Sequence, residues 1–259
     1  MLGILPSLHV ESISMALGLD HSILLGLASF LTGGLTAAVG VGGGVALLAV
    51  MASLLPGPAI IPLHGLAQAY ANGVRAGLNR RHIQWPVVSA FLVGMVLGTI
   101  LAGFVVVNLP PAAIKIGLGI FVIIQTMGLL PASIFVKSGQ RLMSSTSIGV
   151  MSMFFGAPGP LVAAAIHQMG VDQRHYNGTH AMVMVVLHGS KLATFLVLGF
   201  AFMAYLDAII AIIIGSTLGT LIGQQFMTRL SPEYFRQGLT WVLILVGVQL
   251  VLSGLHSIL

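Results

Sequence analysis

Four polar side chains stand at helical spacing inside an otherwise apolar stretch of the chain. They are His64, Gln68, Asn72 and Arg75, at positions i, i+4, i+8 and i+11. At 100° per residue these positions lie within about 80° of one another, so they form one stripe along a helix. A guanidinium in an apolar surrounding faces a cavity or a partner of opposite charge. The stripe predicts an anion-binding surface; the alternative for Arg75 is that its head snorkels to a polar interface.

A second stripe repeats the first one 116 residues later. Its members are His180, Met184, His188 and Lys191. Histidine is the side chain whose charge changes most readily near neutral pH. We therefore take His64, His180 and His188 as candidates for proton coupling. The alternative is that each imidazole only forms hydrogen bonds between helices.

The chain offers these cations few carboxylates. Its five acidic residues all stand near expected loops or helix ends: Glu11, Asp20, Asp172, Asp207 and Glu233. A buried cation without a carboxylate partner carries a desolvation cost that a bound anion offsets. We therefore interpret Arg75 and Lys191 as ligands of an anionic substrate, with Asn72 and Gln68 beside Arg75 as further binding residues.

Glycines interrupt an apolar run at two equivalent places. The first break contains Gly42, Gly43 and Gly44 within AVGVGGGVAL, and the second contains Gly156 and Gly159 within FFGAPGPLVA. Each glycine costs a helix interior on the order of 1 kcal/mol. A half-helix that begins at such a break presents free N–H groups and the positive end of its dipole, which suits an anion. We predict that these glycines bind substrate; the alternative is that they only allow close helix packing.

Composition places the chain in a lipid bilayer. Of its 259 residues, 57% are hydrophobic and 6% charged, and the mean hydropathy is +1.07; soluble domains carry roughly 25% charged residues. The net charge of +5 fits basic loops at one membrane face, so we expect no nucleic-acid partner. There is no cysteine, and the 13 methionines are scattered. We therefore expect no metal site and no cofactor.

Two constant offsets reveal an internal duplication. His64 and Arg75 align with His180 and Lys191 at an offset of 116, and GMVLGT (94–99) aligns with GSTLGT (215–220) at 121. Glycine, histidine and basic residues that align at constant offsets over this length indicate two copies of one unit. We divide the chain into a lead-in (1–21), membrane repeat 1 (22–135), a cytoplasmic linker (136–144) and membrane repeat 2 (145–259).

Each unit is expected to hold a glycine-broken segment followed by three transmembrane helices. The expected broken segments are 22–56 and 145–170; the helices are 59–78, 84–107 and 111–131, then 176–199, 203–227 and 233–256. The halves of the second broken segment are too short to span a bilayer. It is either one broken span or a re-entrant pair. Re-entry places Arg80, Arg81, Lys137, Arg174 and Arg229 on one cytoplasmic side, as the positive-inside rule favours. Each unit then crosses three times, so we predict an all-α polytopic membrane protein with two inverted repeats.

The glycine-rich GVGGG, the proline-bounded half-helix, the polar stripe and the duplication together resemble the sulfite exporter TauE/SafE family. The resemblance extends over roughly residues 25–255. It implies a multi-pass transporter of the bacterial cytoplasmic membrane that moves sulfite, thiosulfate or an organosulfonate. The second break departs from the pattern, because Pro158 and Pro160 stand where repeat 1 has glycines.

The expected function is therefore a secondary transporter that works by alternating access between the two repeats, with proton coupling through the histidines. A passive anion channel and a cation or metal permease are the alternatives. The sequence contains no motif of an enzyme, so we expect no catalytic activity. Gly94-x3-Gly98 and Gly215-x3-Gly219-x3-Gly223 are small-residue faces that pack closely within the bundle or at a homodimer contact.

Overall fold

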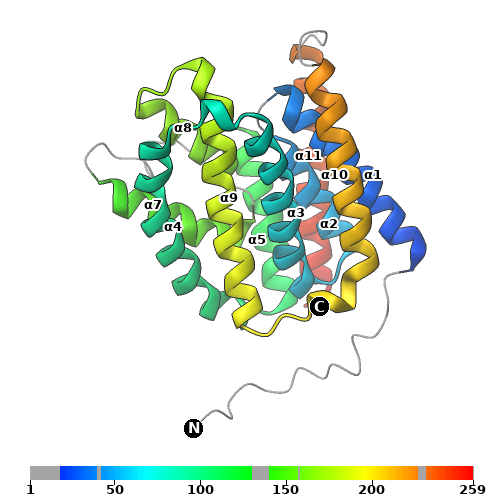
Figure 1. Cartoon of the computed structure of the whole chain (residues 1–259). Coiled ribbons are helices and arrows are strands. Elements are labelled where there is room, and N and C mark those ends of the chain that lie inside the picture. Colours follow the sequence, from blue (N-terminus) through cyan, green and yellow to red (C-terminus); the bar gives the residue numbers. More distant parts are fainter. Residues whose placement is uncertain (1–17, 40–41, 130–139, 157, 227–231, 259) are drawn as a thin grey trace.

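The computed structural model describes residues 18–39, 42–129, 140–156, 158–226 and 232–258 (Figure 1). Every regular element in these residues is a helix. The first half contains α1 (Leu19–Val39), α2 (Gly43–Leu54), α3 (Gly57–Leu78), η2 (Arg80–His82), α4 (Trp85–Val106) and α5 (Pro111–Thr126). The second half contains α7 (Arg141–Phe155), α8 (Gly159–Gln168), α9 (Gln173–Val197), η3 (Phe202–Tyr205), α10 (Leu206–Phe226) and α11 (Pro232–His256). The order of helices is the same in both halves.

Proline and glycine set several helix ends. Pro111 and Pro232 each occupy the first position of a helix, where a missing N–H leaves no hydrogen bond unmade. Gly156 ends α7 with φ +77°, and Gly42 precedes α2 with φ +102°, values that favour glycine. The predicted breaks therefore lie where the sequence placed them, although α7 begins at Arg141, four residues before the predicted 145, and α5 ends at Thr126, before the predicted 131.

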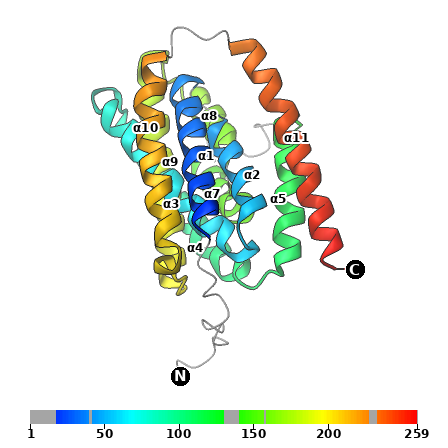
Figure 2. The ribbon, with the colours of Figure 1, turned by 90° about the vertical axis from the view of Figure 1, so that its right-hand side faces the viewer.

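The two halves interleave, and most helices pack against a helix of the other half. The extensive pairs are α1 with α10, α4 with α7, α3 with α9, and α5 with α11. Figure 2 shows α1 beside α10 and α5 beside α11, while α3 and α9 stand at the centre in Figure 1. Exchanging the halves turns the α1–α10 pair into the α7–α4 pair and leaves the other two pairs unchanged. The helices therefore obey an approximate twofold relation.

Contacts at the glycines give the direction of two pairs of equivalent helices. On α5 and α11, Gly119 lies against Gly247, whereas Gly254 lies against Ala112. On α3 and α9, Gly65 lies against Lys191, whereas Gly178 lies against Asn79. Both pairs are thus antiparallel, because contacts move forward on one helix as they move back on its partner. Antiparallel equivalent helices are what inverted repeats would give.

The small-residue faces of α4 and α10 pack within the bundle. Gly94 and Gly98 face Ser145 and Thr146 of α7, and the glycines of α10 face α1. A Cβ at Gly98 would come within 2.2 Å of the Thr146 carbonyl oxygen, so only glycine permits this approach. The expected close packing in the bundle is confirmed. A homodimer stays a prediction, and it would need another surface.

Four helices among the described residues are long and apolar enough to cross a membrane. They are Leu19–Ala38, Trp85–Val106, Arg174–Val197 and Phe202–Gln225. Large apolar side chains on the outside of the bundle, such as Leu101 and Phe104 of α4, are more than 60% exposed, as lipid contact requires. Two helices that were predicted to cross, α3 and α5, do not meet this criterion. α5 has only 16 residues, and the polar stripe lowers the mean hydropathy of α3.

The first broken segment is longer than its counterpart. α1 has 21 residues and is long enough to span by itself, whereas α2 has 12 residues, α7 has 15 and α8 has 10. α2 and α8 rise about 18 Å and 15 Å at 1.5 Å per residue, well under a hydrocarbon core of about 30 Å. Gly43 at the start of α2 lies against Thr32 and Thr36 of α1, so the chain turns back beside α1. Re-entry into the membrane stays a prediction.

Candidate functional site

A small pocket lies between the two helix breaks. α1, α2, α3, α8 and α9 contribute to its wall. The lining residues are Thr36, Gly42, Gly44, Val45, Gln68, Asn72, Arg75, Gly159, Pro160, His180, Met184 and His188. We call this space the central cavity. The two breaks, 116 residues apart in sequence, thus meet at one place.

The N-terminus of α2 opens onto the central cavity without a side-chain cap. The first intrahelical hydrogen bond runs from Ala46 N to the Gly42 carbonyl oxygen (3.1 Å). The amides of Gly43, Gly44 and Val45 precede it, in the turn where a helix has no internal acceptors for its N–H groups. This end of α2 carries partial positive charge. Repeat 1 therefore contributes a backbone surface suited to an anion.

The N-terminus of α8 is chemically poorer. Pro160 has no N–H, and Leu161 N already donates to the Pro158 carbonyl oxygen at 3.0 Å. Gly159 is the remaining amide in the first turn of α8. The proline substitutions at the second break thus remove donors, so the backbone of the two breaks is not equivalent as an anion site.

The polar stripe of α3 forms a connected network at the cavity wall. Arg75 Nη1 donates to Asn72 Oδ1 (3.1 Å), and Asn72 Nδ2 donates to the Gln68 carbonyl oxygen (2.8 Å). Arg75 is only 5% exposed, so its guanidinium remains in the bundle. The three residues also line a small adjoining pocket between α1, α3 and α10. Three of the four predicted stripe residues thus form one surface.

His64 and His180 make the same kind of bond in the two repeats. His64 Nε2 donates to the Gly44 carbonyl oxygen (2.9 Å), and His180 Nε2 donates to that of Gly159 (3.4 Å). Each imidazole therefore ties α3 or α9 to the first turn of a half-helix. This is the interhelical hydrogen bonding that the sequence offered as an alternative. Proton coupling through these two residues stays a prediction.

His188 differs from the other two histidines. Its side chain is fully buried and lines the central cavity. Neither ring nitrogen has a hydrogen-bond partner among the described residues. Its ring lies 5.7 Å from that of His64, edge to face. A buried polar group without a protein partner indicates an unseen partner such as water or a ligand.

Lys191 lies next to the central cavity but is not part of its lining. Its side chain is fully buried, and Nζ donates to the Gly156 carbonyl oxygen (2.7 Å). That carbonyl stands at the C-terminal end of α7, which carries partial negative charge. The lysine stem passes Gly65, where a Cβ would lie 2.8 Å from Lys191 Cδ. Contact between Lys191 and an anion stays a prediction.

The predicted binding residues therefore divide into two groups. Eight line the central cavity: Gly42, Gly44, Gln68, Asn72, Arg75, Gly159, His180 and His188. Four are not part of its lining: Gly43, Gly156, His64 and Lys191. Sequence reasoning missed Thr36, which reaches the cavity from α1 while its hydroxyl donates to the Thr32 carbonyl oxygen (2.8 Å). The spacing of Ser29, Thr32 and Thr36 at i, i+3 and i+7 is the signal in the sequence that could have found it.

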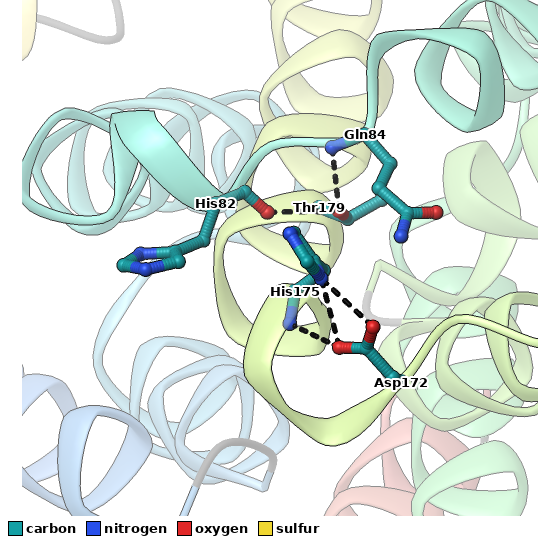
Figure 3. Close-up of polar contacts among 5 residues, drawn as sticks. All are labelled: His82, Gln84, Asp172, His175 and Thr179. Atoms are coloured by element: carbon teal, nitrogen blue, oxygen red, sulfur yellow. Dashed lines mark hydrogen bonds and ion pairs between the residues drawn. The ribbon is translucent and has the colours of Figure 1, made fainter.

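A second polar cluster fastens the two halves where α9 begins (Figure 3). Gln84 N donates to Thr179 Oγ1 at 2.9 Å, which joins the η2–α4 corner to α9. Asp172 caps α9, accepting from His175 N (2.9 Å) and from its imidazole (2.8 Å). These bonds lower the pKa of the exposed Asp172 carboxyl, with the backbone bond as the larger cause. Among the described residues, no three His, Cys, Asp or Glu side chains are grouped to hold a metal ion.

The described residues form a helical bundle with four helices long and apolar enough to cross a membrane and a pocket between two helix breaks, as in a polytopic membrane protein. Residues 25–250 match the family described as Sulfite exporter TauE/SafE. The match covers most of the chain, which therefore belongs to the sulfite exporter TauE/SafE family. Comparisons with curated proteins and with solved structures give no match. The resemblance seen in the sequence is confirmed, and the family is one of membrane transporters.

Proposed function

We propose that the chain is a secondary transporter of small sulfur-containing anions, namely sulfite, thiosulfate or an organosulfonate. The observation that carries the proposal is the central cavity, where the open N-terminus of α2 and the buried Arg75 face one space. Both groups are positive and desolvated, so an anion binds there with little competition from water.

Oxygens of the anion would accept hydrogen bonds from Arg75, from Gln68 and Asn72, and from the amides at the start of α2. Charge-assisted bonds to a guanidinium are the strongest of these. Repeat 1 then provides most of the affinity. Lys191 acts behind the site by holding the end of α7, and His64 and His180 hold the half-helices in place.

Movement across the membrane would follow from the twofold relation of the repeats. A transporter made of inverted repeats opens alternately to each face when one repeat rocks against the other around a site near the midplane. The antiparallel pairs α3–α9 and α5–α11 support this scheme. The bacterial cytoplasmic membrane is the proposed location, with Arg80, Arg81 and Arg174 on the cytoplasmic side.

Transport by purified protein in proteoliposomes tests the proposal directly. The wild type should take up labelled sulfite, thiosulfate or a sulfonate, and Arg75→Gln should abolish most of the uptake. Arg75→Lys should keep part of it, because lysine retains the charge and loses the planar fork. Arg81→Gln, on the exposed η2, is the matched control and should transport normally. Uptake that never exceeds the outside concentration and ignores a protonophore would indicate a channel instead.

Labelling of single cysteines tests the proposed topology, since the chain has no native cysteine. Arg81→Cys and Arg174→Cys are both at exposed positions and should react with an impermeant maleimide from the same membrane face. Ala201→Cys, between α9 and α10, should react only from the opposite face. Reaction of the first two variants from opposite faces would contradict a returning α7–α8 pair.

A further inference from the structure

The small pocket between α1, α3 and α10 adjoins the central cavity, and hydroxyl groups line much of it. We call it the hydroxyl pocket. The hydroxyls come from α1 and α10, and they belong to Ser29, Thr32, Thr36, Ser216 and Thr220. Four polar residues line both spaces, namely Thr36, Gln68, Asn72 and Arg75. A ligand can therefore pass from one space to the other while it stays in contact with the same side chains.

Two of these hydroxyls have no bonding partner in the protein part that the structure describes. Ser29 and Thr220 are both 0% exposed, and neither Ser29 Oγ nor Thr220 Oγ1 forms a hydrogen bond with a described residue. Thr220 Oγ1 lies beside Gly33 of α1, where a Cβ would come within 3.5 Å of it. A buried hydroxyl without a partner is costly unless water or a ligand bonds to it. The hydroxyl pocket is the space from which such a partner can reach both groups.

The equivalent hydroxyls of repeat 2 are satisfied within their own helices. Ser145 corresponds to Ser29 at the offset of 116, and Thr99 corresponds to Thr220 at the offset of 121. Ser145 Oγ donates to a backbone carbonyl oxygen of α7 at 2.8 Å, and Thr99 Oγ1 donates to one of α4 at 2.9 Å. The same residue types thus have internal acceptors in repeat 2, whereas in repeat 1 they are left to the pocket.

Apolar side chains fill the equivalent place in repeat 2. Met95 stands where α10 has Ser216, and Ile148 stands where α1 has Thr32. Both side chains are 0% exposed and belong to one apolar cluster with Leu187 of α9. An ion in that place would lose its hydration without gaining hydrogen bonds. A polar space beside the central cavity is therefore a property of repeat 1 and not of its copy.

We propose that the hydroxyl pocket is a second binding station for the transported anion, adjacent to the central cavity and present in repeat 1 alone. The inference rests on the proposed function and adds the route by which the anion reaches its site. A hydroxyl rotates to donate to whichever oxygen approaches it, so Ser29 and Thr220 replace part of the hydration shell of the anion. No aspartate or glutamate is among the described lining residues, so no carboxylate repels the anion there.

The helices around the hydroxyl pocket indicate how it widens to admit an anion. α1 and α10 are interlocked, because Gly33 lies against Ser216 and Gly219 lies against Phe30 (Figure 2). These two helices therefore keep their mutual position. α3 is joined to α10 by the hydrogen bond between Tyr70 Oη and Thr217 Oγ1 (2.8 Å), and one neutral hydrogen bond is a weak obstacle. Widening thus parts the α1–α10 pair from α3.

Reaction rates of single cysteines in the purified full chain test the proposal, since the chain has no native cysteine. Ser29→Cys and Thr220→Cys are treated with the anionic reagent 2-sulfonatoethyl methanethiosulfonate and with its trimethylammonium counterpart, each rate being divided by that of a free thiol. Ser145→Cys and Thr99→Cys are the matched controls from repeat 2. Because a thiol reacts as an accessible thiolate, we expect the first two variants to react roughly tenfold faster than the controls. They should also prefer the anionic reagent, and saturating thiosulfate should slow their reaction.

Transport by variants without the hydroxyls gives a second measurement, which serves if the cysteine variants fold poorly. Ser29→Ala and Thr220→Val should each lower the rate of uptake into proteoliposomes by roughly 2- to 10-fold, as loss of one neutral hydrogen bond to the anion predicts. Ser145→Ala and Thr99→Val should stay within about twofold of the wild type, because their hydroxyls bond only within a helix.

The outcomes separate the two levels of inference. Equal rates with both reagents and no protection by thiosulfate would show a pocket that holds water only, which overturns the anion station. Equal labelling of the repeat 1 and repeat 2 positions also overturns it, and so does unchanged uptake by Ser29→Ala and Thr220→Val. A folded wild type that neither binds nor transports any of the anions overturns the proposed function itself, and this result depends on no variant and no reagent.

Discussion

Arg75 and Lys191 occupy equivalent positions on α3 and α9, yet their heads lie in different surroundings. Arg75 borders the central cavity and bonds to Asn72, whereas Lys191 donates to the Gly156 carbonyl oxygen behind the cavity. The backbone differs in the same sense, since the first turn of α2 contains no proline, whereas the start of α8 contains Pro160. The two halves therefore share one order of helices but differ in the groups they present.

The same comparison holds along the whole stripe. Gln68 and Asn72 of repeat 1 correspond to Met184 and His188 of repeat 2. Repeat 1 thus presents fixed hydrogen-bond donors and a permanent charge. Repeat 2 presents a soft apolar side chain and a titratable one. His64 and His180 are a feature that the two halves share, because each bonds to the first turn of its half-helix.

The largest expected effect is a difference in stability between the alanine variants of the equivalent glycines Gly43 and Gly159. A Cβ at Gly43 would lie 2.1 Å from the Thr32 carbonyl oxygen, whereas a Cβ at Gly159 would meet nothing closer than Met184 Cε at 3.7 Å. Gly43→Ala should cost about 3 kcal/mol or more, since backbone must shift. Gly159→Ala should leave stability unchanged or raise it by about 0.4–1 kcal/mol. Folded yield and thermal midpoint in detergent measure both; equal midpoints would refute this difference between the breaks.

Removing either cation should have the next largest effect, which falls on KM for Arg75 and on the maximum rate for Lys191. Arg75→Met should raise the transport KM by roughly 10- to 100-fold, because a charge-assisted bond to substrate is worth about 1.5–3 kcal/mol. Lys191→Met should reduce the maximum rate and the thermal midpoint, because the Gly156 carbonyl loses its donor, and change KM by less than about threefold. Initial rates over a substrate series in proteoliposomes supply these values. A large KM change in Lys191→Met would place Lys191 in contact with the anion.

Substituting methionine for Gln68 should have a moderate effect on the transport KM, and the reverse substitution at Met184 should have little. Gln68→Met makes the first stripe resemble the second and should raise KM by roughly 2- to 10-fold, as loss of one neutral hydrogen bond predicts. Met184→Gln should change KM little, because the substrate oxygens lie toward repeat 1. The same transport assay measures both variants. Stronger impairment by Met184→Gln would place the anion against α9.

The smallest effect concerns the helix starts. Asp172 caps α9 with its side chain, whereas Pro56 at the start of α3 has no side-chain cap bond. The hydrogen bonds from His175 lower the pKa of the Asp172 carboxyl. A carboxyl with a lowered pKa stabilises the fold above its unfolded pKa, and this contribution is lost as pH falls through the folded pKa. Asp172→Ala should therefore lower the thermal midpoint slightly at neutral pH and not at all in strong acid.

A matched variant tests whether the carboxylate charge matters. Asp172→Asn keeps a capping oxygen and should fall between the wild type and Asp172→Ala at neutral pH. Thermal midpoints across a pH series distinguish the three proteins. A constant difference between wild type and Asp172→Ala at all pH values would show that the cap does not depend on ionisation.

Much of the architecture could be predicted because it depends on local chemistry and on the repeat. Four such features can be read directly from the sequence: the mean hydropathy, the glycine breaks, the prolines at helix starts (Pro111 and Pro232), and the spacing of the stripe. The ends of segments were less predictable. α1 extends into one long helix and α5 ends at Thr126, since the length of an apolar helix depends on what it packs against.

Two glycine-bearing breaks and two polar stripes can be recognised from the sequence alone, because periodicity and offset are properties of one dimension. The folded chain adds that both breaks border one cavity, that Thr36 joins them, and that Lys191 donates to a carbonyl while Arg75 borders the space. Identical spacing gives both cations the same helix face. Where each head lies then depends on the neighbouring helix, here on Gly65 beside the Lys191 stem and on the carbonyl freed at Gly156. Such contacts between residues far apart in sequence leave no trace in a local pattern.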